Sequence, residues 1–129
     1  VIHSSLSQGE RLDQWRKIYM NKVDVVIGAR SAIFAPFDNI GLIIVDEEHD
    51  LSYKQETGFR YNARDLALVR SKLSKCPVIL GSATPSVQSY QNVVLKRFEE
   101  LKLLTRINQR PLPEITLIDL KKYKEKNND

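Results

Sequence analysis

The stretch Leu42-Ile43-Ile44-Val45-Asp46-Glu47-Glu48-His49-Asp50 carries four apolar residues straight into four acids and a histidine. An apolar run without polar alternation is typical of a parallel strand that is buried on both faces. Open α/β sheets bind their ligands beyond the carboxyl ends of such strands. The stretch therefore predicts a binding edge, where Mg²⁺ and nucleotide phosphates would offset the repulsion among the acids. A charged turn after a core strand is the plainer alternative.

The composition fits a soluble globular protein of one domain or part of one. The 129 residues are 42% hydrophobic and 28% charged. No apolar run approaches the roughly 18 residues of a membrane span, so we expect no membrane partner. The one cysteine, Cys76, excludes an internal disulfide and indicates a reducing cytoplasm. Two histidines and one cysteine, widely spaced, do not make a zinc site.

The net charge of +4 is unevenly placed along the chain. Residues 1–50 carry 5 basic and 8 acidic side chains, whereas residues 51–129 carry 15 and 8. This uneven distribution of charge fits a metal-binding acidic cluster beside a polyanion-binding surface. The alternative is ordinary surface variation together with a lysine-rich tail. The chain starts with Val-Ile-His, and we expect it to be a piece of a longer protein.

Strand and helix patterns alternate along the chain. The strands are expected at 1–2, 25–28, 41–45, 78–80, 101–104 and 115–118, and the helices at 8–21, 63–74 and from Pro85 onward, with a helical turn at 31–37 and a polar, aromatic loop at 51–61. The expected N-terminal signals are a Ser7–Glu10 capping box and the N-caps Asn62 and Thr84. The expected inward residues are Leu12, Trp15, Ile18, Tyr19, Leu66, Val69, Leu73, Val87, Tyr90 and Val94.

Alternating strands and helices predict an α/β fold with a mainly parallel sheet flanked by helices. In that topology Arg30, Asp46 and Ser82 all follow the carboxyl ends of strands. We therefore expect three polar clusters to meet at one edge of the sheet.

Several strings resemble the motifs of superfamily 2 helicases. Val45-Asp-Glu-Glu-His49 is similar to their D-E-x-H box, and Gly81-Ser-Ala-Thr-Pro85 is similar to their S-A-T motif. Val26-Ile-Gly-Ala-Arg-Ser31 resembles the strand and arginine that touch nucleic acid in the first motor lobe. The longer strings 27–37, 46–55 and 60–65 are similar to the bacterial replication-restart helicases, and the resemblance runs from residue 1 to about 120.

This resemblance implies a partial RecA-like lobe of the P-loop NTPase type over residues 1–119. The composition of residues 120–129 is polar and lysine-rich, and we expect this tail to be disordered. It implies an ATP-dependent 3′-to-5′ DNA helicase of the bacterial cytoplasm, which acts in primosome assembly and replication restart. The implied partners are single-stranded and forked DNA, primosome proteins and single-stranded DNA-binding protein. The cofactors are ATP and Mg²⁺, with zinc only in a later part of the parent. No G-x-x-x-x-G-K-[ST] occurs here, so we expect the chain alone to be inactive.

The resemblance also assigns residues to the nucleotide. Asp46 would hold Mg²⁺, and Glu47 would orient or deprotonate the attacking water. His49 would connect the nucleotide site to Ser82 and Thr84, although a plain surface histidine is the alternative. The expected nucleotide-site residues are Asp46, Glu47, His49, Gly81, Ser82, Ala83 and Thr84. We expect Glu48 to be solvated or paired.

Basic and aromatic residues form the candidate DNA surface. Arg30 with Ser31 suits phosphate contact, with a buried salt bridge as the competing role of Arg30. Aromatic faces can stack on unpaired bases while cations meet the backbone, and the loop candidates are Tyr53, Lys54, Phe59, Arg60, Tyr61 and Arg64. Tyr61 has packing onto the domain as its alternative. Another superfamily 2 translocase, for repair or branch migration, and a non-catalytic nucleic-acid-binding module stay open as rival functions.

Overall fold

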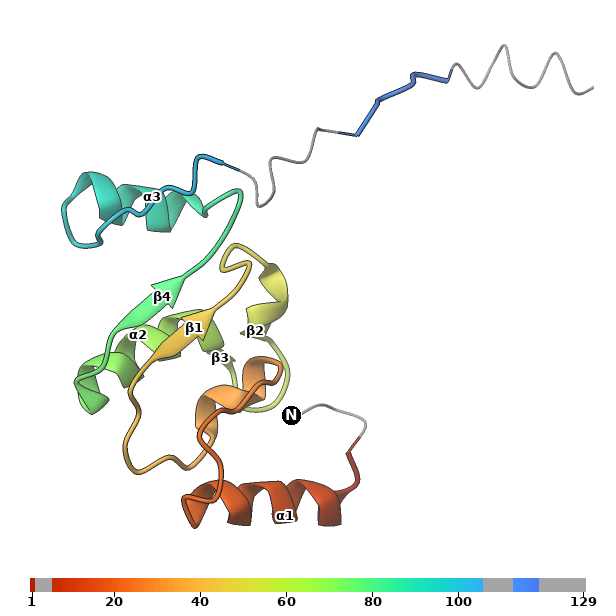
Figure 1. The fold of residues 1–129 in the computed structure, drawn as a ribbon, viewed down its shortest axis with the longest axis vertical. Helices are drawn as coiled ribbons and strands as arrows, with labels where there is room; N and C mark the ends of the chain where they lie inside the picture. Colours follow the sequence, from red (N-terminus) through yellow and green to blue (C-terminus); the bar gives the residue numbers. More distant parts are fainter. Residues whose placement is uncertain (2–5, 106–112, 119–129) are drawn as a thin grey trace, which may run out of the picture. The chain divides into compact units, whose positions relative to one another are not determined.

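The computed structural model describes Val1, residues 6–105 and residues 113–118. The chain divides into two compact units, Val1–Phe98 and Glu99–Asp129. Every helix and strand of the described residues lies in the first unit (Figure 1). In the second unit, the late strands expected at 101–104 and 115–118 do not form, and both segments are exposed. The expected first strand at 1–2 and the tail at 120–129 fall largely or wholly outside the described residues.

A pair of parallel strands forms the centre of the first unit. β1 (Ile43–Val45) pairs with β4 (Val78–Leu80), and Val45 lies opposite Leu80 in the register. The chain between them passes through a short antiparallel hairpin and helix α2 (Ala63–Ser74), which contacts both strands (Figure 1). The expected α/β arrangement, with parallel strands joined through a helix, is therefore confirmed, and the carboxyl ends of β1 and β4 lie side by side.

Helix α2 approaches the sheet through small residues. Asn62 is the N-cap, as expected, and its side chain accepts a hydrogen bond from the backbone N–H of Arg64. The buried positions are Ala63, Ala67 and Ser71, four residues apart along one face. The expectation that Val69 and Leu73 face inward is wrong, because the stripe of small residues, and not the stripe of large ones, is the buried face of α2.

Helix α1 (Gln8–Tyr19) begins with the expected capping box. Its buried residue Ile18 packs with Ala35, and Val23, Val26 and Phe37 surround this small core. Trp15 is half-buried. Leu12 and Tyr19, which were expected to face inward, are exposed because the 23–37 segment covers only one side of the helix.

Two further expectations about elements are wrong. Residues 25–28 form no strand beyond an isolated bridge at Gly28, because no neighbouring strand completes a ladder there. Helix α3 (Val87–Val94) has Ser86 as its N-cap, with the Ser86 hydroxyl accepting from the Ser89 N–H, so Thr84 is not the cap. The expected inward residues Val87, Tyr90 and Val94 are exposed.

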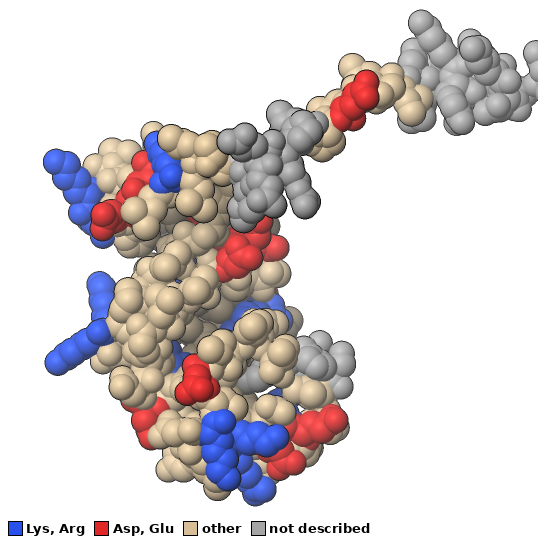
Figure 2. All heavy atoms as spheres, in the orientation of Figure 1, with Lys and Arg blue, Asp and Glu red and all other residues tan. Residues whose placement is uncertain are grey.

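The segments around the site are short. The expected helical turn is the 3-10 helix η1 (Arg30–Phe34). The expected loop contains a second one, η2 (Leu51–Tyr53), and the antiparallel pair of β2 (Lys54–Gln55) with β3 (Tyr61–Asn62). On the face drawn in Figure 2, basic and acidic side chains are interspersed. Within the described residues no helix has both the length and the apolar character needed to cross a bilayer.

Candidate functional site

The residues after β1 and β4 are tied together by their backbones. The N–H of Gly81 donates to the carbonyl of Val45 at 2.8 Å, and the N–H of Glu48 donates to the carbonyl of Gly81 at 3.0 Å. The Asp46 Oδ1 atom lies 3.6 Å from the position that a Cβ on Gly81 would occupy. The topology therefore places the acidic box, residues 46–49, against the turn 81–84, as the alternation of strands and helices predicts.

The box leaves β1 through an unusual backbone conformation. Glu47 has a φ of 46°, in the left-handed region that non-glycine residues seldom adopt. Hydrogen bonds hold it there: the Glu47 N–H donates to Asp46 Oδ1 at 3.0 Å, and the Asp50 N–H donates to the Glu47 carbonyl at 2.9 Å. Asp46 and Glu47 are both exposed. The turn thus presents two neighbouring carboxylates to solvent.

The donor set at Asp46 fits one kind of metal site. No cluster of three or more His, Cys, Asp or Glu side chains that could hold a metal occurs in the described part of the chain. Among the described residues, a cage made wholly of these protein ligands is therefore not formed. Mg²⁺ binds proteins through one or two carboxylates and takes its remaining oxygens from water and phosphates, which matches an exposed Asp46.

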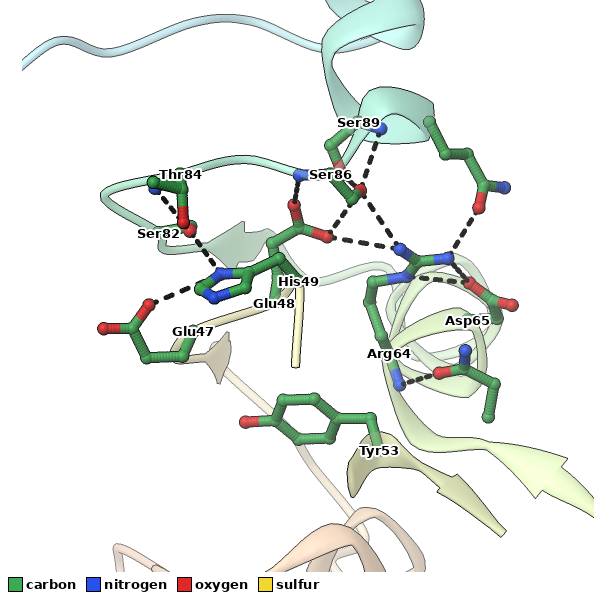
Figure 3. Close-up of polar contacts among 12 residues, drawn as sticks. Glu47, Glu48, His49, Tyr53, Arg64, Asp65, Ser82, Thr84, Ser86 and Ser89 are labelled. Carbon is green, nitrogen blue, oxygen red and sulfur yellow. Dashed lines mark hydrogen bonds and ion pairs between the residues drawn. The ribbon is translucent and has the colours of Figure 1, made fainter. Parts of the chain in front are cut away.

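His49 joins the box to the turn (Figure 3). Its Nδ1 atom lies 2.7 Å from the hydroxyl of Ser82 and 3.5 Å from Glu47 Oε2. The backbone N–H of Thr84 donates to the same Ser82 hydroxyl at 3.0 Å. The side chain of His49 thus contacts Ser82 directly and reaches Thr84 only through it, while Ala83 and Thr84 are exposed.

Glu48 is the buried member of the box, with 2% of its surface exposed. Its carboxylate accepts from the Ser86 N–H at 2.6 Å, from the Ser86 hydroxyl at 3.1 Å and from Arg64 Nη1 at 3.3 Å. Burial acts to raise the pKa of Glu48, but hydrogen bonds from Ser86, Ser89 and Arg64 outweigh it and hold the pKa below its usual value. Of the two expected states, Glu48 is paired and not solvated.

Arg64, a candidate DNA contact from sequence, points into the protein. Its side chain is 12% exposed, and Figure 3 shows it between Glu48 and the start of α3. It donates to Glu48, to the Ser86 hydroxyl at 3.2 Å, to Asp65 at 2.9 Å and to Gln88 at 2.6 Å. Sequence patterns missed this role, because nothing local links residue 64 to residues 48 and 86. The only sequence feature that pointed to this role was Glu48, the acid of the box that had no assigned task and needed a partner.

Two candidate DNA contacts also hold the loop against the rest of the site. The Tyr53 hydroxyl donates to the backbone carbonyl of Asp46 at 2.6 Å. Arg30 Nη1 donates to the backbone carbonyls of Ser52 and Lys54, each at 3.2 Å. Arg30 therefore anchors the loop through backbone carbonyls, and it forms no salt bridge with any residue that the structure describes. Ser31, next to it in η1, is exposed.

Of the remaining loop candidates, Lys54, Phe59 and Arg60 are exposed and Tyr61 is half-buried. Phe59 is 76% exposed, and its ring lies 5.9 Å from that of Tyr61, which packs edge-on against Phe34 at 5.0 Å. Arg60 is exposed. Lys54 is also exposed and pairs with Glu56 at 2.8 Å. A surface hollow of about 600 Å³ lies along the hairpin, lined by Lys54, Gln55, Glu56, Arg60, Tyr61, Asn62 and Asp65.

Comparison with known proteins identifies a family and several relatives. A family model described as DEAD/DEAH box helicase matches residues 1–93. The chain is 52% identical over 121 residues to the replication restart protein PriA of Bacillus subtilis, which covers 94% of this chain and 15% of that protein. It is 44% identical over 128 residues to PriA of Rickettsia felis, covering 99% of the chain and 20% of the relative. PriA of Synechocystis is 46% identical over 126 residues, again with 15% of the relative covered. The chain thus spans about a fifth or less of the length of these relatives.

Proposed function

This chain belongs to the DEAD/DEAH box helicase family, and we propose that it forms part of the motor of a longer DNA helicase that acts in replication restart. The similarity to replication restart proteins from several bacteria supports this role. In the proposed protein, hydrolysis of ATP drives 3′-to-5′ translocation along single-stranded DNA. Forked DNA, primosome proteins and single-stranded DNA-binding protein are its proposed partners in the bacterial cytoplasm.

The contact between the acidic box and the 81–84 turn carries this proposal. Asp46 and Glu47 stand side by side and exposed, and His49 bonds to Ser82 at 2.7 Å. Two adjacent carboxylates suit hydrolysis of a nucleoside triphosphate, because one meets the metal and the other meets the attacking water. The Ser82 hydroxyl accepts from the Thr84 N–H and also bonds to His49 Nδ1, and a hydroxyl shared in this way suits the transmission of a change at the phosphates.

Each residue then has a defined task. Asp46 holds Mg²⁺, through water or directly, and the bound ion supplies charge stabilisation at the phosphates. Glu47 orients the attacking water and accepts its proton. Gly81, Ser82, Ala83 and Thr84 form the turn that faces the nucleotide, and His49 links that turn to the box.

The outward loop residues form the proposed DNA surface. Lys54 and Arg60 meet phosphates, and Phe59 stacks on an unpaired base, which is a sequence-tolerant way to bind a single strand. The Tyr61 ring contacts both the Phe34 ring and the Phe59 ring, so it supports Phe59. Arg30 and Ser31 flank this surface.

The 129 residues contain no G-x-x-x-x-G-K-[ST] phosphate loop. We propose that this piece alone binds nucleotide weakly and hydrolyses ATP negligibly, and that any zinc of the parent binds outside it. The deciding experiment uses the full-length protein with duplexes carrying a 3′ or a 5′ single-stranded tail. We expect ATP-dependent unwinding of the duplex that carries a 3′ single-stranded tail, and no unwinding of the duplex that carries a 5′ tail. DNA binding without any hydrolysis would instead indicate a non-catalytic module.

A further inference from the structure

We propose that Glu48 and Arg64 form a positioning pair that couples the DNA-facing hairpin to hydrolysis at the box; this inference rests on the proposed function. Glu48 lies between Glu47 and His49, which both have proposed nucleotide tasks. Arg64 lies two residues after the end of the hairpin, in the first turn of α2. Arg64 Nη1 lies 3.3 Å from Glu48 Oε2, and the two side chains are only 12% and 1% exposed to solvent.

The pair connects three segments that are far apart in the sequence. Glu48 belongs to the box, Arg64 follows the hairpin, and Ser86 follows the 81–84 turn. Both charged side chains bond to the Ser86 hydroxyl, and Glu48 also accepts from the Ser86 backbone N–H at 2.6 Å. Figure 3 shows these bonds as one shared set. A shift of the hairpin that moves Arg64 would therefore act on both the box and the turn.

Stability alone is a weak reason for this pair. Taking two charges out of water costs free energy that their attraction often fails to repay, and apolar residues of similar size can do as well or better. What such a pair does supply is a fixed geometry, because several directional bonds must be satisfied together. That is the property needed at a junction between a binding loop and a catalytic box.

The bonding of Arg64 also argues against a direct DNA role. A guanidinium has five N–H donors. Two on Nη1 serve Glu48 and Ser86, two on Nη2 serve Asp65 and Gln88, and the one on Nε serves Asp65. All five are used inside the protein, so a phosphate would have to displace an existing partner.

The test compares Glu48→Gln, Arg64→Lys and the double variant in the full-length protein. Hydrolysis of ATP is measured without DNA and with saturating single-stranded DNA, beside the Kd for a labelled oligonucleotide. We expect each single variant to lower the ratio of stimulated to basal kcat by about fivefold or more. Coupling between two sites in a protein typically has an effect of at least about this size. The Kd should stay within roughly twofold, because phosphate contacts are unchanged. The double variant should lose no more than the worse single one, since the two residues act as a unit.

A control separates positioning from general stability. Ile18→Val weakens the small core around Ala35, outside the network, and should leave the ratio unchanged. Three results would each overturn the inference and leave the proposed function standing. The first is an unchanged ratio in Glu48→Gln, and the second is an equal fall of the ratio in Ile18→Val at the same loss of thermal stability. The third is weaker DNA binding by Arg64→Lys alone. A wild-type protein whose hydrolysis single-stranded DNA does not stimulate would overturn both.

Discussion

The hydroxyl of Tyr53 donates a hydrogen bond to the backbone carbonyl of Asp46 over 2.6 Å. This bond directly links η2, the 3-10 helix that precedes β2, to Asp46, the proposed metal-binding residue. Burial, and then the charges of Asp46, Asp50 and Glu47, raise the pKa of Tyr53 above its usual value. The hydroxyl therefore remains a donor at every physiological pH.

Tyr53→Phe removes this bond and keeps the ring. We expect a loss of about 1 kcal/mol in the free energy of unfolding, typical of one hydrogen bond, and weaker stimulation of hydrolysis by DNA. Affinity for single-stranded DNA should not change if the ring makes the contact. Urea denaturation and ATPase assays with the full-length protein check this, and undiminished stimulation would show that the bond is unimportant for coupling.

Glu47→Gln should abolish turnover and leave ATP binding intact. The amide keeps the size of the side chain but accepts no proton from water, and loss of a general base typically costs about 10²–10⁴-fold in rate. Glu56→Gln is the matched control, because Glu56 is an exposed acid of the hairpin whose partner is Lys54. Equal rates in the wild type and Glu47→Gln would remove Glu47 from its role.

Lys54→Ala combined with Arg60→Ala should reduce DNA-stimulated hydrolysis more than basal hydrolysis. Loss of two phosphate contacts should also weaken single-strand binding by about tenfold and reduce its salt dependence. Lys17→Ala with Lys72→Ala removes the same charge from exposed helical positions on α1 and α2. If that control weakens binding equally, the effect is one of net charge and the hairpin is not the site.

Arg70→Ala should destabilise the fold around η1. The Arg70 guanidinium donates to the backbone carbonyls of Ile33 and Ala35, and burial lowers its pKa. Its removal leaves two carbonyls with less bonding, at a cost of about 2 kcal/mol. Arg70→Lys should recover only part of this, because an ammonium lacks the fork that reaches both oxygens. Thermal denaturation of the three proteins measures the difference, and a full recovery by lysine would contradict the bidentate role.

Glu48 should make part of the stability depend on pH. Its pKa is lowered in the folded state from an ordinary value of 4.5. The unfolded chain therefore takes up the proton first, so this contribution is present above about pH 4.5 and is lost as the pH falls through the folded pKa. Unfolding free energies measured from pH 7 to about pH 3 should fall more steeply for the wild type than for Glu48→Gln. Parallel curves would show that Glu48 gains nothing from its partners.

The sequence identified the parts of the site that depend on strand ends. An apolar run before Asp46 and another before Gly81 sufficed to place the box beside the turn, because the ends of neighbouring parallel strands lie together. The two helix starts with strong local signals, at Ser7 and Asn62, were also correct. These features are set by short-range chemistry that a single sequence displays.

Burial was harder to predict. Periodicity predicts that the large residues Val69 and Leu73 form the inner face of α2, whereas Ala67 and the small residues one turn away are the buried ones. Periodicity marks two possible stripes on such a helix, and only the distance between helix and sheet decides between them. The strands expected at 25–28 and 101–104 did not form, because an apolar run becomes a strand only where a partner completes its hydrogen bonds.

The pairing of Glu48 with Arg64 shows a third limit. A charged residue within a motif and a charged residue after a hairpin each read as surface residues. Their burial follows from the path of the chain through the hairpin and the 81–84 turn, which brings residues 48, 64 and 86 to one point. Roles of this kind depend on tertiary structure, so residue type and local spacing did not predict them.

The left-handed backbone of Glu47 has a consequence for anyone selecting thermostable variants. Most side chains with a Cβ resist this conformation by about 1–2 kcal/mol, whereas asparagine tolerates it better because its short polar side chain can hydrogen-bond locally. A screen for melting temperature alone would thus favour Glu47→Asn, which relaxes the turn and removes the proposed base. Thermal stability and ATP turnover would therefore be opposed at this one position, and the most stable variant would be catalytically inactive.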